Sequence, residues 1–517
     1  MKVLLVTGLL AEEMVKNYTK NYRDVEVHTL RVPVAAFLTT EYIAQELKKL
    51  NLENFDMILV PGMARGDTSV ITNATGVPAF KGPRYAADLP LIMEFLGVEK
   101  LSTSIPACEI LKENIKRRSL QELERIESRR DVLLKNPGNM LLEDLALGKD
   151  FPMRIIAEIV DAPLLSTNEI QTLAKHFVNS GADIIDVGMI AGECRPGDAE
   201  RAVKAVKQVV NVPVSIDTFD PGEAAEGVKA GASLVLSVDA GNMEEMAKAV
   251  SNAAVVVTPT NQLEGYMPKN VDDRVKFLEE NIERAERLGF RKIIGDLILE
   301  PADVLKSFIA YHKFAERNPH VPLLMGLSNV TELMDADSVG VNALLAKVAS
   351  EIGVSLLLVT EKSNKSKGSV KEAVLASRMM FLAKARGSSP KDLGVDLLIL
   401  KEKRMREEPY PKKWELTAEI RRPVEDVKRN LVMDRGFFRI FVDREEGMIA
   451  AAFFPDAHAE KPKIIFKGRT AEEVYNEIIG QKLLGIAEHI AYIAKELTKA
   501  EIALKIGRSY VQDEPVF

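Results

Sequence analysis

Short apolar runs alternate with helical segments through the middle of the chain, and this alternation is the strongest constraint on its fold. The runs cover residues 154–160, 182–188, 212–217, 232–239, 253–259, 291–299, 321–329 and 354–362. The segments between them, such as GDAERAVKAVKQVV at 197–210, carry apolar residues at helical spacing. Eight strands in strict alternation with helices over about 220 residues predict a (β/α)8 TIM barrel rather than an open sheet.

The barrel fills only part of the 517 residues, so we expect flanking domains. Another apolar run, VDLLILKEKR at 395–404, lies outside the barrel count, and beyond it a hairpin is predicted around the turn DREEG. Thr470 and Glu473 have the spacing of a capping box at a helix start. The expected divisions are an open α/β domain at 1–110, a helical linker at 111–150, the barrel at 151–395 and a small α+β module at 396–517.

Composition and charge exclude several classes of protein. The chain is 46% hydrophobic and 28% charged, and its net charge of -7 is not gathered in a block, which argues against a nucleic-acid-binding surface. No run reaches the roughly 18 apolar residues that cross a bilayer, and the first residues lack a signal-peptide cleavage site. Because Cys108 and Cys194 form no CxxC pair, we expect a reducing cytoplasm and neither a disulfide framework nor a cysteine zinc site.

Carboxylates stand at or near the ends of five predicted strands: Asp161, Asp186, Asp217, Asp239 and Asp296. Each could cap the following helix, but the carboxyl ends of barrel strands meet at one mouth, where ligands bind. Several acids without accompanying histidine or cysteine suit either Mg²⁺ or a ligand rich in N–H donors. A 2-amino-4-oxo pterin is such a ligand, because its paired N–H groups match the two oxygens of a carboxylate.

Part of the barrel sequence also resembles a known family. The matching segments are GADIIDVG at 181–188, RPGDAE at 195–200, VPVSIDTFDPGEAAEGVKAGASLVLSVDAG at 212–241 and GDLILEP at 295–301. They resemble the pterin-binding superfamily, which includes dihydropteroate synthase and corrinoid-linked methyltransferases. The whole chain, including its tail from about residue 430, is similar to archaeal proteins related to dihydropteroate synthase. This resemblance implies a TIM barrel that binds a reduced pterin, tetrahydromethanopterin or tetrahydrofolate, and it implies a homodimer.

The resemblance assigns roles to individual residues. Asp217, Asp239 and Asp296 would contact the pterin ring from the third, fourth and sixth strands. After the seventh strand, GLSNVTELMDADSVGVNALL at 326–345 replaces the lysine-containing segment of a synthase and resembles the methyltransferase branch, where Asn329 would polarise pterin N5. The predicted pterin-binding residues are Asp161, Asp186, Asp217, Asp239, Asp296 and Asn329; the secondary candidates are Arg195, Asn242 and Asn342; the predicted catalytic residues are Asn329 and Lys362.

Three functions stay open at this point. The first is a cytoplasmic transferase that binds a reduced pterin and handles its one-carbon unit, with Mg²⁺ as a candidate additional cofactor. The second is a synthase-like condensation of a pterin-CH2 pyrophosphate with an aryl amine, in which Lys362 and its neighbours in TEKSNKSKG at 360–368 would replace the lost anion site. The third is a non-catalytic pterin carrier or regulatory subunit.

Two absences complete the expectations. The sequence contains no corrinoid-binding DxHxxG motif, so a corrinoid methyl acceptor would have to be carried by a separate protein. The six histidines form no metal-like cluster in the sequence, so no protein ligand set for a transition metal is predicted.

Overall fold

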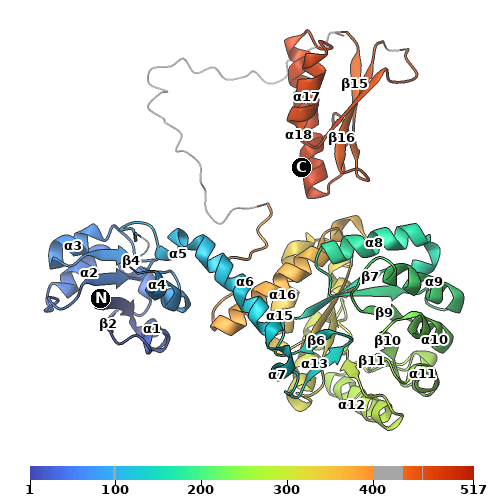
Figure 1. Ribbon diagram of the computed structural model, residues 1–517, viewed down its shortest axis with the longest axis horizontal. Helices are drawn as coiled ribbons and strands as arrows, with labels where there is room; N and C mark the ends of the chain where they lie inside the picture. Colours follow the sequence, from blue (N-terminus) through green and yellow to red (C-terminus); the bar gives the residue numbers. More distant parts are fainter. Residues whose placement is uncertain (97–99, 401–434, 457, 517) are drawn as a thin grey trace. The chain divides into compact units, whose positions relative to one another are not determined.

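The computed structural model describes residues 1–96, 100–400, 435–456 and 458–516 (Figure 1). The chain divides into two compact units, Met1–Leu400 and Lys401–Phe517. The first unit holds an open sheet domain and a barrel, and the second holds a small domain with an antiparallel sheet. Among the described residues, no helix is both long enough and apolar enough to cross a membrane.

The first domain is built on a parallel sheet of strand order β2-β1-β3-β4. Leu4 and Val6 of β1 pack against the α2 and α3 side, whereas Val3 and Leu5 pack against the α1 and α4 side, because successive strand residues point to opposite faces. Helices therefore cover both faces of the sheet. Its elements are β1 Val3–Gly8, α1 Glu12–Thr19, β2 Val25–Leu30, α2 Thr40–Leu47, β3 Met57–Val60, α3 Ser69–Thr75, β4 Ala79–Lys81, α4 Leu89–Phe95 and α5 Ala107–Ile110.

A hairpin follows the helices that lead into the barrel. The elements are α6 Lys112–Ser128, α7 Arg130–Leu133, β5 Asn139–Leu142 and β6 Leu145–Gly148. The stretch 111–150 was predicted as a helical linker; its first part is helical, and the hairpin occupies its second part. Leu142 and Leu147 of the hairpin pack in one buried cluster with Ile156 and Ile184 of the barrel strands. The hairpin therefore fills the end of the barrel at which the strands begin.

The eight predicted strands are confirmed, and they lie in the order β12-β11-β10-β9-β8-β7-β14-β13 as one parallel sheet. A parallel bridge between Gly295 and Leu323 joins the two end strands, so the sheet closes into a barrel. The strands are β7 Arg154–Ile159, β8 Ile184–Gly188, β9 Val214–Asp217, β10 Leu234–Val238, β11 Ala254–Val257, β12 Ile293–Gly295, β13 Leu324–Gly326 and β14 Leu356–Thr360.

Helices surround the barrel, and local signals set where they begin. Ser166 and Glu169 form a capping box at the start of α8, and the Asp220 side chain caps α10 just before Pro221. The helices are α8 Thr167–Asn179, α9 Pro196–Lys207, α10 Pro221–Ala230, α11 Met243–Val250, α12 Val271–Arg287, α13 Val304–Arg317, the short α14 Ser328–Thr331, α15 Ser338–Ile352 and α16 Ser369–Arg386.

The second unit contains a three-stranded antiparallel sheet with strand order β15-β16-β17 and two helices against one face. The predicted capping box is confirmed, with Thr470 and Glu473 at the start of α17. The apolar run at 395–404 forms neither helix nor strand over 395–400, and its remainder lies outside the described residues. The elements are β15 Phe437–Asp443, β16 Met448–Phe454, β17 Ile464–Gly468, α17 Ala471–Gly480 and α18 Ala487–Ile506.

Candidate functional site

Carboxyl groups line the interior of the barrel near its mouth. Ile156 and Ile184 belong to the buried cluster inside the barrel, and two residues further along the same strands stand Glu158 and Asp186, which therefore also point inward. Asp217 stands two residues beyond Ser215 of β9, whose hydroxyl donates to Asp186. Asp296 stands two residues beyond Ile294 of β12, which belongs to the same inner cluster. We call these four residues, Glu158, Asp186, Asp217 and Asp296, the acid layer.

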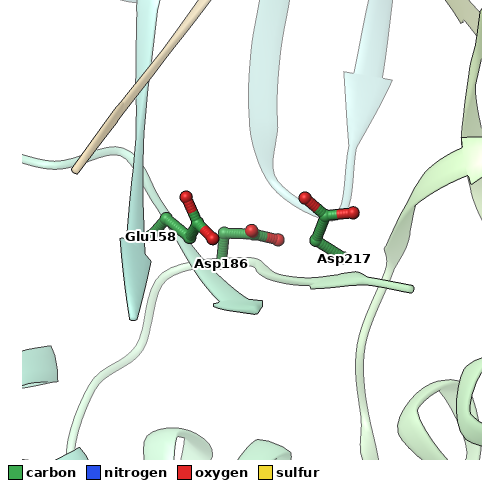
Figure 2. A group of neighbouring side chains, drawn as sticks. All are labelled: Glu158, Asp186 and Asp217. Atoms are coloured by element: carbon green, nitrogen blue, oxygen red, sulfur yellow. The ribbon is translucent and has the colours of Figure 1, made fainter. Parts of the chain in front are cut away.

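Three members of the acid layer lie very close together. One carboxyl oxygen from each of Glu158, Asp186 and Asp217 lies within 4.8 Å of the others, and Figure 2 shows the three side chains in a row on neighbouring strands. Asp186 is completely buried, and its Oδ1 accepts a hydrogen bond of 2.6 Å from Ser215 Oγ. Its Oδ2 has no hydrogen-bond partner among the described residues. The cluster therefore has fewer donors than acceptors, and a proton or a ligand must supply the difference.

Burial and mutual repulsion raise the pKa values of these groups. Burial, and then the neighbouring carboxylates, raise the pKa of Glu158 to about 8, and the same causes raise the pKa of Asp217 to about 8. Burial and then Asp217 raise the pKa of Asp186 well above its ordinary value of 3.8. The acid layer therefore holds protons at neutral pH, and a protonated carboxyl group can donate as well as accept a hydrogen bond.

Asp296 is held by its own set of donors. Its Oδ1 accepts hydrogen bonds from the Tyr311 hydroxyl of α13 and, at 2.8 Å, from the backbone N–H of Ile298. Burial raises the pKa of Asp296 to about 6, and these two donors oppose that rise. Ile298 has φ +63, a conformation that is strained for a β-branched residue. Strained backbone of this kind often marks a site whose geometry matters for function.

Asp239 does not join the acid layer. The register between β10 and β11 shifts near Val238, and the buried carboxylate that follows accepts bonds from surrounding loops. Oδ1 accepts from the N–H groups of Gly241 at 2.8 Å and Asn242 at 3.2 Å, and Oδ2 accepts from Thr260 Oγ1 at 2.9 Å and the N–H of Gln262 at 2.7 Å. The Asn242 amide donates in turn to nearby backbone carbonyls. These hydrogen bonds show that Asp239 and Asn242 hold the surrounding loops in place.

Asp161, Lys362 and Arg195 lie outside the acid layer. Asp161 follows β7 with a φ of +53 and forms an ion pair of 3.0 Å with Lys362, whose side chain is 59% exposed. The two residues are near enough to Glu158 to affect its pKa, Asp161 raising it and Lys362 lowering it. Arg195 pairs with Glu193 at 2.5 Å and Asp198 at 3.4 Å, and its backbone N–H donates to Glu223. Arg195 is therefore held by acidic neighbours.

Asn329 stands on the short helix α14, directly after β13, and is exposed. A Cβ atom placed on Gly326 would lie 3.2 Å from Asn329 Nδ2, so the amide covers the backbone of β13 at this glycine. Asn342 is buried behind that helix. It accepts a hydrogen bond of 2.9 Å from Thr331 Oγ1 and donates to Glu372 at 2.9 Å. Asn342 thereby supports the helix that carries Asn329.

The acid layer also has the donor set of a hard cation. Oxygen ligands from three carboxylates suit Mg²⁺, which prefers carboxylate and water ligands. A bound divalent cation would satisfy Asp186 Oδ2 and remove the repulsion that keeps protons on the layer.

Glu158 was not among the residues singled out from the sequence. Asp161, three residues further on, was chosen instead because it follows the end of the predicted strand. A stronger signal was available, because Ile156 and Glu158 occupy the same face of one strand and Glu158 is the acidic residue within the run RIIAEIV.

Comparisons with known proteins show what the parts of this chain are similar to. Residues 160–360 match the family model described as pterin binding enzyme. Residues 1–84 match a family of unknown function, DUF6513, and residues 433–513 match the model PterinBD-DUF4346. The dihydropteroate synthase of Clostridium beijerinckii is 30% identical over 183 residues, which is 32% of this chain and 63% of that protein. A solved dihydropteroate synthase from Stenotrophomonas maltophilia is 21% identical and covers 48% of this chain and 99% of its own, with a TM-score of 0.40.

These matches define the class of the central domain as a pterin-binding barrel. The full chain is similar to the uncharacterized protein MJ0107 of Methanocaldococcus jannaschii, with 39% identity over 531 residues that cover 100% of this chain and 99% of that protein. The protein therefore belongs to the pterin-binding superfamily related to dihydropteroate synthase, and within it to the family of the M. jannaschii protein.

Proposed function

We propose that this protein is a cytoplasmic transferase that binds a reduced pterin on the acid layer and transfers a one-carbon unit from it. The observation that carries this proposal is a layer of four inward-facing carboxyl groups at the barrel mouth, three of which crowd together. A 2-amino-4-oxo pterin offers N–H donors to ionised carboxylates and ring acceptors to protonated ones. Tetrahydromethanopterin and tetrahydrofolate are the candidate pterins.

The same layer supports the chemistry of methyl transfer. When the bond between the methyl carbon and N5 breaks, the electron pair stays on N5, so a proton on that nitrogen makes it a neutral leaving group. Glu158, with a pKa near 8, holds a proton at neutral pH and is our proposed donor. Asn329 is proposed to hydrogen-bond N5, and Lys362 to hold an anionic group of the substrate at the rim. The methyl group passes to a nucleophile on a separate acceptor, for which a corrinoid protein is the candidate.

Pterin binding is expected to release about one proton at neutral pH, because the N–H donors of the ring select the ionised form of Asp217, whose pKa is about 8 in the free protein. The release should fall toward zero above about pH 9, where the free carboxyl group is already ionised. Calorimetric titration in buffers of different ionisation enthalpy measures this number. Proton uptake, or no exchange at neutral pH, would contradict the proposed protonation of the layer, and saturating Mg²⁺ should suppress the release if the cation occupies the same oxygens.

Turnover separates the candidate functions. With the methyl derivative of either pterin, we expect methyl transfer to a reduced corrinoid or thiol acceptor, and Glu158→Gln should slow it by about a hundredfold, in the range seen for a lost general acid. The matched substitution Glu200→Gln changes an exposed glutamate that pairs with Lys204 and should leave the rate unchanged. Transfer at an equal rate in Glu158→Gln would refute the role of this residue.

The synthase-like reaction is the second candidate, favoured by the lysines that follow β14, of which Lys362 is exposed and Lys365 reaches the backbone carbonyl of Met334. Its test is pyrophosphate release from a hydroxymethylpterin pyrophosphate and p-aminobenzoate. Pterin binding without either turnover would favour the carrier. A homodimer stays a prediction, and sedimentation of the full chain tests it.

A further inference from the structure

The loop after β12 is anchored at both of its ends. At its start, the Tyr311 hydroxyl of α13 donates to Asp296 Oδ1. At its far end, the Glu300 N–H donates to Ser307 Oγ of the same helix at 3.0 Å, and Arg274 of α12 forms an ion pair of 2.7 Å with the Glu300 carboxylate. Tyr311 and Ser307 are four residues apart and therefore lie on one face of α13. That face holds both ends of the loop that carries Asp296.

The backbone of this loop is strained, and the anchoring contacts maintain it. Ile298, midway along the loop, has φ +63, and its N–H donates to Asp296 Oδ1 at 2.8 Å. A β-branched residue keeps this conformation only where the surrounding structure stabilises it. Tyr311 and Arg274 are 0% and 2% exposed, so close packing leaves their side chains little freedom to move. The Asp296 carboxylate is therefore held in place by groups outside its own strand.

Only one oxygen of Asp296 remains open. Oδ1 accepts two hydrogen bonds, from Tyr311 and Ile298, whereas Oδ2 accepts none from the described residues. A carboxylate oxygen offers about two acceptor positions, so Oδ1 is saturated and Oδ2 can accept from up to about two N–H groups. Asp296 is partly exposed, and Oδ2 is not one of the buried side-chain atoms that lack a partner, so a ligand can reach it. The Tyr311 hydroxyl thereby determines which oxygen of Asp296 a ligand meets.

We propose that Tyr311 is a positioning residue for pterin recognition, whose hydroxyl saturates Oδ1 of Asp296 and turns Oδ2 toward the N–H donors of the pyrimidine part of the ring. This inference rests on the proposed function, and it assigns a role to a residue that does not itself contact the pterin. Without the hydroxyl, only the Ile298 N–H holds Oδ1. The terminal torsion of an aspartate has a broad energy minimum, so the carboxylate then rotates more freely and accepts less selectively.

The first measurement is calorimetric titration of the full-length protein with methyl-tetrahydromethanopterin or methyl-tetrahydrofolate, whichever the parent protein binds more tightly. Tyr311→Phe removes only the hydroxyl and should weaken binding about fivefold, a change of the size expected for one hydrogen bond. In the Asp296→Asn background, the same change should alter the affinity by less than about twofold, because the amide presents an NH2 group to the pterin with or without the hydroxyl. The matched control Tyr22→Phe removes a hydroxyl that donates to the Pro90 carbonyl in the first domain and should leave the affinity unchanged.

The second measurement separates positioning from a general loss of stability. The probes are 6-methyl-tetrahydropterin and 6-methyl-tetrahydrolumazine, in which a carbonyl oxygen replaces the exocyclic amine. A carboxylate oxygen held toward that edge of the ring rejects the carbonyl, so the parent protein should prefer the pterin by at least about tenfold. Tyr311→Phe should reduce this ratio by about threefold or more, whereas a purely structural effect would weaken the binding of both probes and leave the ratio unchanged. Calorimetric melting shows that the compared variants are folded.

The possible failures are distinct. If the parent binds a reduced pterin and Asp217→Asn weakens it, but Tyr311→Phe keeps the parent's affinity and ratio, the role of Tyr311 is overturned and the proposed function stands. Equal weakening by Tyr311→Phe in the Asp296→Asn background would also overturn it, because the hydroxyl would then act on another group. A parent protein that binds no reduced pterin would refute the proposed function, and the role of Tyr311 with it.

Discussion

Replacing Asp217 by asparagine is expected to weaken the binding of a reduced pterin by more than about tenfold while leaving the barrel folded. Asparagine has nearly the same shape, but one of its two oxygen acceptors becomes an NH2 donor, which faces the N–H donors of the pterin instead of accepting from them. The negative charge that would strengthen those bonds is also lost. Asp296→Asn is expected to act in the same direction. Calorimetric titration with methyl-tetrahydromethanopterin and with methyl-tetrahydrofolate measures both effects.

The matched control is Asp272→Asn on the outer helix α12, where the carboxylate pairs with Lys313 at 2.8 Å. This variant should bind the pterin like the parent protein. Unaltered binding in Asp217→Asn and Asp296→Asn together would remove the acid layer from the site, and equal weakening in all three variants would indicate a general effect of the substitution.

Neutralising one member of the acid layer is expected to stabilise the protein at alkaline pH. The folded-state pKa of Glu158 is about 8 against an ordinary value of 4.5, so the folded protein binds more protons than the unfolded chain between these pH values. The free energy of unfolding therefore falls as the pH rises through this window, and the stabilising contribution of the neutral group, fully present below about pH 4.5, is lost as the pH passes about 8.

Glu158→Gln removes this titration, and its amide can donate to the unpartnered Asp186 Oδ2. At about pH 8.5, we expect the variant to be more stable than the parent by on the order of 2 kcal/mol, which corresponds to a rise of about 4 to 8 °C in the melting temperature of the barrel. Near pH 4 the two should melt alike. Calorimetric melting across this range tests the difference, with Glu200→Gln as the surface control; a variant that is less stable than the parent at alkaline pH would contradict the raised pKa.

Both predictions follow from the crowding of carboxyl groups in the acid layer. Crowded carboxyl groups in a barrel interior cost stability, because each loses its hydration and repels its neighbours. The same crowding leaves acceptors such as Asp186 Oδ2 open to a ligand with N–H donors. Higher stability on substitution at Glu158 and lower pterin affinity on substitution at Asp217 are the behaviour expected of one binding site, and structural ion pairs would not show it.

The barrel was predictable from the sequence, because buried parallel strands are nearly continuous apolar runs separated by helices. The strands that were not predicted from the sequence lack such a continuous apolar run. β2, with the sequence VEVHTL, carries charged and half-exposed residues, and β4 has only three residues. β5 and β6 have four residues each and stand just after a strongly helical segment, so their packing against Ile156 inside the barrel was visible only in three dimensions.

The candidate site was predictable in part. Asp186, Asp217 and Asp296 were chosen as strand-end acids, and the inward alternation of the strands brings them into one layer. Glu158 was missed because it lies inside an apolar run instead of at its end. The position of Asp239 could not be foreseen, since it depends on the register shift near Val238 and on loop donors that are distant in sequence.

The most direct test of the proposed function is an experimental structure of the full-length protein soaked with a reduced pterin. We predict that the pyrimidine part of the ring lies within hydrogen-bonding distance of the carboxyl groups of Asp217 and Asp296, with N5 toward Asn329 or Glu158. A pterin bound elsewhere on the barrel, or an acid layer that remains without ligand at saturating pterin, would contradict it.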